Sequence, residues 1–328
     1  MRARSILESV TLRLLAVACV AVVGCQAAPS PRASRVAPLF TPGTGLLPDL
    51  VADATRLDQA SSAERFDAVL ALLRQRDLSF EIQPFTASRT EEHPRVDGRN
   101  VVVDVGTGDR DLIVGAHADA VVLDDGSLSH GMVDNAAAVA VLVRVAAALQ
   151  DYALQHRVRV VLFDLEELGL LGSRHFVESL GPGRVAGMVN LDIAGHGDTV
   201  LFGPAASAGN QRLYASVRQA CADGAHECLE FAKFPTGDDR SFQAAGIPNV
   251  SLSILPRLEA HQLWLLFNSG NDDAGLRDDF VPPILRIIHT PADTAQVLDA
   301  RGMTLAYDMV MRVVLQLDRW GEAGPGRD

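Results

Sequence analysis

The stretch "RVRVVLFDLEELGLLGSRHF", residues 157–176, places two adjacent acids directly after an apolar run. "VRVVLFDL" is a continuous series of mostly branched and aromatic side chains, typical of a central strand covered on both faces. "LGSRHFVESL" follows with the pattern of a helix. A strand that leads through Glu166 and Glu167 into a helix indicates a layered α/β fold, and the adjacent acids call for an explanation.

The alternation of strand and helix runs from residue 46 onward. Ser61 and Glu64 have the spacing of a capping box ahead of an amphipathic helix. We expect strands at 80–85, 100–105, 111–119, 158–165, 186–195, 199–203 and 249–255, and helices at 61–75, 134–150, 171–180, 209–223 and 300–320. This order predicts a three-layer α/β/α domain with a mostly parallel central sheet. In such sheets ligands gather at the carboxyl ends of the strands.

Composition narrows the possible functions. The chain has 328 residues, of which 48% are hydrophobic, enough for one large core. The net charge of -12 comes without a cluster of Lys and Arg, and binding to phosphate backbones needs such a cluster. We therefore expect no nucleic-acid partner.

The N-terminus has the pattern of an export signal. A basic flank precedes "LLAVACVAVV", residues 14–23, which is shorter than the roughly 20 residues that span a bilayer. The segment ends in "VVGC", which resembles a bacterial lipobox. It predicts a lipoprotein signal peptide over residues 1–24 and lipidation of Cys25. Gln26 then favours the periplasmic face of the outer membrane; ordinary cleavage to a soluble periplasmic or secreted protein is the alternative.

Residues 25–45 follow as a flexible tether rich in Pro and Ser, and residues 46–322 form the predicted domain. Cys221 and Cys228 are the two cysteines that remain for this domain. Because an exported chain meets an oxidising compartment, we predict a disulfide between them.

Acids and histidines stand at the predicted strand ends. They are His117, Asp119, Glu166, Glu167 and Asp192, and two further residues join them from outside the strands: Asp134 begins a predicted helix, and His289 lies in "IIHTPADT". Each alone has a structural explanation, for example Asp134 as a helix N-cap. Together they have the composition of a two-metal site, in which imidazoles and carboxylates bind the ions, one carboxylate bridges them and another handles protons.

Six blocks of sequence carry a family resemblance. They are "GAHAD", "GMVDNAAAVAVLV", "FDLEELGLLGSRHF", "VNLDIAG", "AAGIPNVSL" and "HTPADT". Their order and spacing resemble the co-catalytic di-zinc aminopeptidases, family 28 of the metallopeptidases, over residues 95 to 320. Glutamate carboxypeptidase and glutaminyl cyclases are also relatives. The resemblance implies a zinc-peptidase (phosphorylase/hydrolase-like) fold that holds two Zn²⁺ ions per chain.

The resemblance also implies roles for single residues. His117 and Asp192 would bind one zinc, and Glu167 and His289 the other. Asp134 would bridge both ions. Glu166 would be the general acid/base, and Asp119 would orient His117. The adjacent acids would thus divide proton transfer and metal binding between them.

The resemblance implies a zinc-dependent exopeptidase, namely an aminopeptidase that removes N-terminal residues from peptides with a free N-terminus. Two zinc ions would activate the water that attacks the peptide bond. Three alternatives stay open: a glutaminyl cyclase-like aminoacyltransferase, another exopeptidase specificity, and an inactive binding ectodomain on a peptidase fold.

Two segments depart from the family or lack a clear role. Gly237-Asp238-Asp239 stands where relatives often have Ser-Asp-His, near the expected substrate pocket. Residues 256–287 form either a pocket wall, with Trp264 and Phe267 as apolar contacts, or a surface insertion without a substrate role.

Overall fold

The computed structural model describes residues 46–88, 95–181, 183–205, 209–269 and 280–319. The predicted signal peptide, the tether and Cys25 lie outside the described residues. The predicted domain boundaries stay a prediction.

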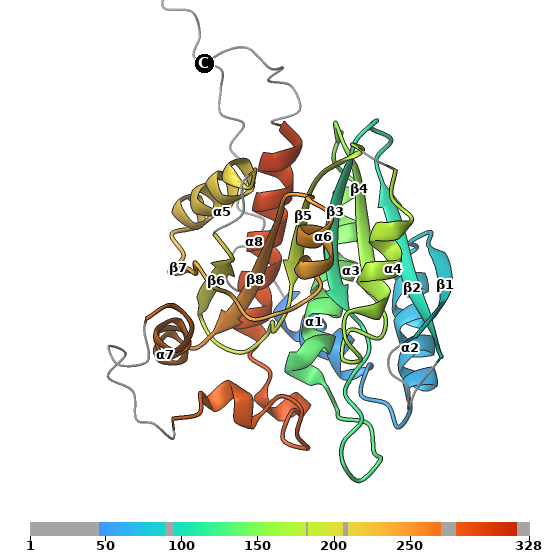
Figure 1. Cartoon of the computed structure of the whole chain (residues 1–328), viewed down its shortest axis with the longest axis vertical. Helices are drawn as coiled ribbons and strands as arrows, with labels where there is room; N and C mark the ends of the chain where they lie inside the picture. Colours follow the sequence, from blue (N-terminus) through green and yellow to red (C-terminus); the bar gives the residue numbers. More distant parts are fainter. Residues whose placement is uncertain (1–45, 89–94, 182, 206–208, 270–279, 320–328) are drawn as a thin grey trace, which may run out of the picture. The chain divides into compact units, whose positions relative to one another are not determined.

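Eight strands form one mixed sheet in the order β1-β2-β4-β3-β5-β8-β6-β7 (Figure 1). The strands are β1 (Glu81–Ala87), β2 (Val96–Val105), β3 (Asp111–His117), β4 (Arg157–Phe163), β5 (Val185–Leu191), β6 (Thr199–Gly203), β7 (Cys228–Glu230) and β8 (Asn249–Leu255). The four central strands β4, β3, β5 and β8 run parallel. Antiparallel pairs flank them, β2 against β4 on one side and β6 against β8 on the other.

Helices cover both faces of this sheet (Figure 1). They are α1 (Leu46–Thr55), α2 (Ser62–Gln75), α3 (Ala137–Leu149), α4 (Leu171–Glu178), α5 (Gln211–Gly224), α6 (Asp239–Ala244), α7 (Arg257–Asn268) and α8 (Ala300–Arg319). Helices α4 and α6 pack on one face, and α3 and α8 on the other. The predicted three-layer α/β/α architecture is confirmed, with antiparallel strands added outside its parallel centre.

Apolar contacts between the layers account for the arrangement. On one face, Phe163 of β4 meets Phe176 of α4 and Phe242 of α6 in a buried aromatic cluster. On the other side, α3 is apolar nearly all round, and 83% of the window from residue 132 to 149 is buried inside the fold. A window of that composition is long enough to cross a membrane, but here it is a core helix.

The described part of the 256–287 segment packs on the core. Trp264 and Phe267 of α7 lie against a buried cluster that includes Phe231 and Leu201, and the Trp264 indole donates a hydrogen bond to the Glu230 carbonyl at 3.0 Å. These aromatic side chains therefore anchor α7 to the fold. Residues 270–279 lie outside the described residues.

The predicted disulfide is present. It joins Cys221, in the last turn of α5, to Cys228, the first residue of β7. The bridge thus fixes α5 to the sheet edge, where the three-residue strand β7 offers only a short ladder of hydrogen bonds.

Candidate metal centre

Three neighbouring parallel strands, β4, β3 and β5, place side chains at the edge of the sheet where their carboxyl ends lie. His117 is the last residue of β3 and pairs with Phe163 of β4. Asn190 of β5 pairs with Gly115 of β3, so Asp192, two residues further, ends level with His117. Leu165 has the left-handed backbone conformation, with φ at 60°. That conformation is rare outside glycine, and it turns the chain out of the sheet just before the two adjacent glutamates.

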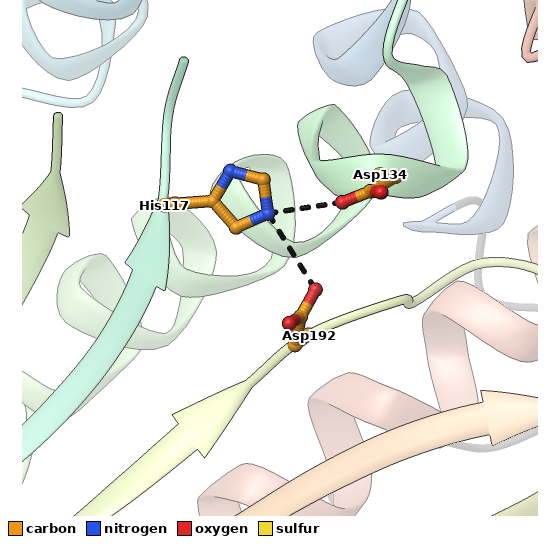
Figure 2. Close-up of side chains that lie close together, drawn as sticks. All are labelled: His117, Asp134 and Asp192. Carbon is orange, nitrogen blue, oxygen red and sulfur yellow. Dashed lines mark hydrogen bonds and ion pairs between the residues drawn. The ribbon is translucent and has the colours of Figure 1, made fainter. Parts of the chain in front are cut away.

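The first group of ligand candidates is His117, Asp134 and Asp192 (Figure 2). The His117 Nε2 atom lies 2.9 Å from Asp134 Oδ1 and 3.5 Å from Asp192 Oδ1. His117 is 2% exposed, so its imidazole meets these carboxylates away from bulk solvent.

The second group is Asp134, Glu167 and His289. The His289 Nε2 atom lies 3.1 Å from Asp134 Oδ2 and 3.2 Å from Glu167 Oε2. The His289 side chain is 53% exposed, so the centre opens to solvent on this side. Asp134 belongs to both groups and turns one oxygen toward each histidine, which is the geometry expected of a bridging carboxylate.

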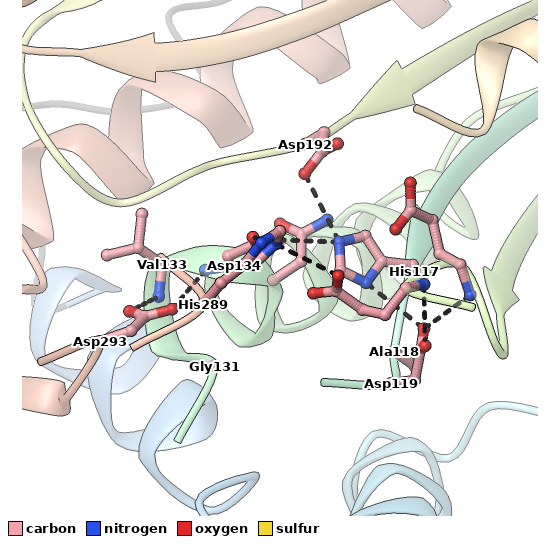
Figure 3. Close-up of polar contacts among 12 residues, drawn as sticks. His117, Ala118, Asp119, Gly131, Val133, Asp134, Asp192, His289 and Asp293 are labelled. Atoms are coloured by element: carbon pink, nitrogen blue, oxygen red, sulfur yellow. Dashed lines mark hydrogen bonds and ion pairs between the residues drawn. The ribbon is translucent and has the colours of Figure 1, made fainter. Parts of the chain in front are cut away.

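Asp119 links the histidine to the adjacent acids (Figure 3). Its Oδ1 atom lies 3.4 Å from His117 Nδ1. The same carboxylate accepts the backbone N–H groups of Glu166, at 3.1 Å, and Glu167, at 3.2 Å. Asp119 therefore makes the predicted contact with His117, and it also binds the backbone of the turn that carries both glutamates.

The carboxylates of the centre raise the pKa of both histidines. Burial alone would lower the pKa of His117, but the carboxylates of Asp119, Asp134 and Asp192 raise it well above its usual range. Contacts with Asp134 and Glu167 raise the pKa of His289 to about 10. Both imidazoles thus favour a positive charge in this pocket of acids.

These properties fit a pair of metal ions. The ligand atoms in each group lie within 4.8 Å of one another. Asp192 Oδ1 and Glu167 Oε1 are buried without a hydrogen-bond partner among the described residues. Mixed imidazole and carboxylate donors are the set that zinc prefers in catalytic sites. Metal cations would supply the positive charge that the histidine protons supply here.

Glu166 lies beside the ligand set. With His117 and Glu167 it forms a third group whose ligand atoms lie within 4.8 Å of one another, a group that does not include the shared Asp134, and burial raises the pKa of Glu166 to about 9. Cations nearby would lower this pKa again, because they stabilise the carboxylate form. A carboxylate so placed can take up and release a proton near neutral pH.

Two further residues position Asp134. The Asp293 carboxylate, 0% exposed, accepts the backbone N–H groups of Val133 at 2.7 Å and Asp134 at 3.1 Å. The Asn135 amide donates to the Leu191 carbonyl at 3.0 Å and so ties the short helical turn Met132–Ala136, ahead of α3, to the end of β5. The sequence signal that could have indicated this role is the position of Asp293 in the "HTPADT" block, four residues after His289.

The Gly237-Asp238-Asp239 segment lies next to Asp192. A Cβ atom at Gly237 would lie 3.1 Å from Asp192 Oδ2, so a side chain there would crowd a ligand candidate. Asp238 and Asp239 are 1% and 0% exposed, and burial raises the pKa of each to about 7. Asp239, at the position where the sequence resemblance implies a histidine, is therefore buried.

Comparison with known proteins places the chain in a family. The sequence model of peptidase family M28 matches residues 100–314. The chain belongs to peptidase family M28. The matched residues include all the ligand candidates and also Asp119 and Glu166. No curated protein sequence matches the chain.

Solved structures of aminopeptidases and a glutaminyl cyclase share the fold. A zinc aminopeptidase from Bacillus subtilis, 15% identical, aligns with a TM-score of 0.62 over 82% of this chain and 94% of its own. An aminopeptidase from Aneurinibacillus, 16% identical, reaches 0.63 over 83% and 93%. Glutaminyl cyclase from Porphyromonas gingivalis, 18% identical, reaches 0.59 over 82% and 95%. The chain thus has a zinc-peptidase fold, which aminopeptidases and glutaminyl cyclases both use.

Proposed function

We propose that this M28 chain is a zinc-dependent exopeptidase, an aminopeptidase that hydrolyses N-terminal residues from peptides. The observation that carries the proposal is the position of Asp134, with one oxygen toward His117 and the other toward His289. Two complete ligand groups around one shared carboxylate support a pair of zinc ions. When bound, the ions would supply the Lewis acidity that polarises a scissile carbonyl and lowers the pKa of water.

The protein's own groups would handle the protons. Glu166 removes a proton from the attacking water and then passes it to the leaving amine, as a general acid/base does. Asp119 keeps the backbone of Glu166 in place and lies 3.4 Å from His117 Nδ1. The surrounding acids also suit a free α-ammonium group, which is why a peptide with a free N-terminus is the proposed substrate.

A glutaminyl cyclase-like transferase is the second candidate, because cyclases share the fold. Its single-zinc chemistry needs only one of the two ligand groups. The presence of both groups, with Asp134 common to them, favours the hydrolase.

A peptide mixture tests the proposal. We would incubate residues 26–328, loaded with zinc, with peptides that have free or blocked amino termini and with Gln-leading peptides, and read the products by mass spectrometry. We expect loss of single N-terminal residues from free-amine peptides only, abolished by a chelator. Loss of ammonia from Gln-leading peptides would instead identify a cyclase. No product at all, or cleavage regardless of blocking, would contradict the aminopeptidase.

We also propose that the chain is exported and attached through lipidated Cys25 to the periplasmic face of the outer membrane. The "VVGC" sequence and the Gln26 that follows support this location. Mass spectrometry of the mature N-terminus should find acyl groups on Cys25. An unmodified terminus after a different cleavage would favour the soluble periplasmic or secreted form.

A further inference from the structure

Arg65 is a buried cation close to the metal centre. It lies in the second turn of α2 and is 1% exposed, which is rare for an arginine. Among the described residues no carboxylate forms an ion pair with its guanidinium. A buried charge without such a partner is costly unless hydrogen bonds satisfy it. Hydrogen bonds must therefore satisfy the Arg65 guanidinium.

The Arg65 guanidinium donates four hydrogen bonds, all to backbone carbonyls. The Nε atom donates to Ala118 at 2.8 Å, and Nη2 donates to Gly131 at 3.0 Å. The Nη1 atom donates to His130 at 2.9 Å and to Leu57 at 3.1 Å. One planar group thus holds three separate chain segments together, a task that suits the rigid fork of arginine.

Two of these segments carry ligand candidates. Ala118 directly follows His117 at the end of β3. Gly131 begins the turn that leads to Asp134, and it has the left-handed conformation with φ at 54°. A Cβ atom at Gly131 would lie 3.3 Å from Arg65 Nη2 and 2.9 Å from the Ala120 side chain, so the tight approach requires glycine.

Asp293 holds the same turn through the backbone N–H groups of the turn. Its carboxylate accepts N–H groups from Val133 and Asp134 (Figure 3), whereas Arg65 donates to the carbonyls of His130 and Gly131. A cation and an anion from distant parts of the sequence thus fix the carbonyl and amide groups of one turn. The 2.9 Å contact between His117 and Asp134 lies between the segments so fixed.

We infer that Arg65 is a positioning residue that sets the separation of His117 and Asp134, and through it the ability of the group His117, Asp134 and Asp192 to bind a metal ion. The inference rests on the proposed function for the identity of that ion. In the described part of the chain, the hydrogen bonds of Arg65 go to backbone carbonyls and not to the side chains of the ligand candidates, so it acts through the backbone of the segments on either side.

Arg65→Lys and Arg65→Met test this inference. Lysine keeps the charge but presents its three donors from a single point, so it cannot span carbonyls on three segments. We expect zinc affinity, measured by calorimetry or chelator competition, to fall about 10–100-fold in both variants, as it does when outer partners of metal ligands are removed. The kcat value should fall with the occupancy, while KM for peptides at saturating zinc stays within a few-fold of wild type.

Arg144→Met is the matched control. Arg144 is a largely buried arginine in α3 that pairs with Asp53 at 3.0 Å, among residues other than the ligand candidates. We expect this variant to lose stability on heating without losing zinc affinity. Zinc binding at wild-type affinity by both Arg65 variants would overturn the inference, and so would failure of both to fold, because the role would then be structural only.

The affinity measurement needs no substrate. If the wild-type chain binds zinc but cleaves no peptide, the proposed function fails and the role of Arg65 is still decided by the same titration. If the chain hydrolyses peptides and the Arg65 variants bind zinc normally, only the inference about Arg65 fails.

Discussion

Glu166→Gln is expected to reduce kcat by about 10²–10⁴-fold, the usual contribution of a general acid/base, while zinc content stays at its wild-type value. The amide keeps the shape of the side chain but cannot take a proton from water or return one to the leaving amine. Because Glu166 lies outside the two groups that share Asp134, its loss should leave metal binding intact.

Glu167→Gln is the control for this prediction, since it makes the same chemical change at the next residue. Glu167 lies 3.2 Å from His289 and belongs to a ligand group. We expect this variant to lose zinc as well as activity, measured by elemental analysis beside steady-state kinetics. A Glu166→Gln enzyme within a few-fold of wild type would remove Glu166 from its role; one that loses zinc would make it a ligand instead.

The role of Glu166 also predicts how the activity depends on pH. Burial raises the pKa of Glu166 to about 9 in the metal-free site, and bound cations would lower it. Glu166 must be deprotonated to accept a proton, so activity should fall as pH drops below its pKa in the loaded enzyme. The fall should be absent in the residual activity of Glu166→Gln.

The sequence predicted the strands of the core well because their signal is local. The apolar run before Glu166 and the run at 249–255 need burial wherever they are placed, and both became central strands. The strands beside them, β3 and β5, bring His117 and Asp192 together, because parallel strands have their carboxyl ends at one edge of the sheet. The family resemblance supplied what strand ends alone do not show, namely His289, which arrives from a loop.

Features that depend on tertiary contacts escaped the sequence. Nothing in "SSAERFDAVL" separates Arg65 from a solvated arginine beside an apolar stripe; its guanidinium is satisfied by four carbonyls, on three segments, that only the fold assembles. The two N–H groups held by Asp119 are hidden for the same reason. Helix α6 and strand β7 are too short for a periodic pattern to mark them.

Asp134→Asn should have the other large effect, the loss of both metal ions and of all metal-dependent activity. The Asp134 carboxylate lies 2.9 Å from His117 Nε2 through one oxygen and 3.1 Å from His289 Nε2 through the other. An amide keeps the shape, yet it carries no charge and offers one acceptor in place of two. We expect the affinity of both sites to fall by more than the roughly 10–100-fold that loss of a ligand's outer partner costs.

Asp192→Asn is the matched variant, because Asp192 belongs to the His117 group alone. Native mass spectrometry at controlled free zinc should find two ions per wild-type chain, one in Asp192→Asn and none in Asp134→Asn. Equal losses in the two variants would mean that Asp134 does not bridge. A single ion in the wild-type chain would remove the main argument against the cyclase, since the shared carboxylate would then have only one metal to hold.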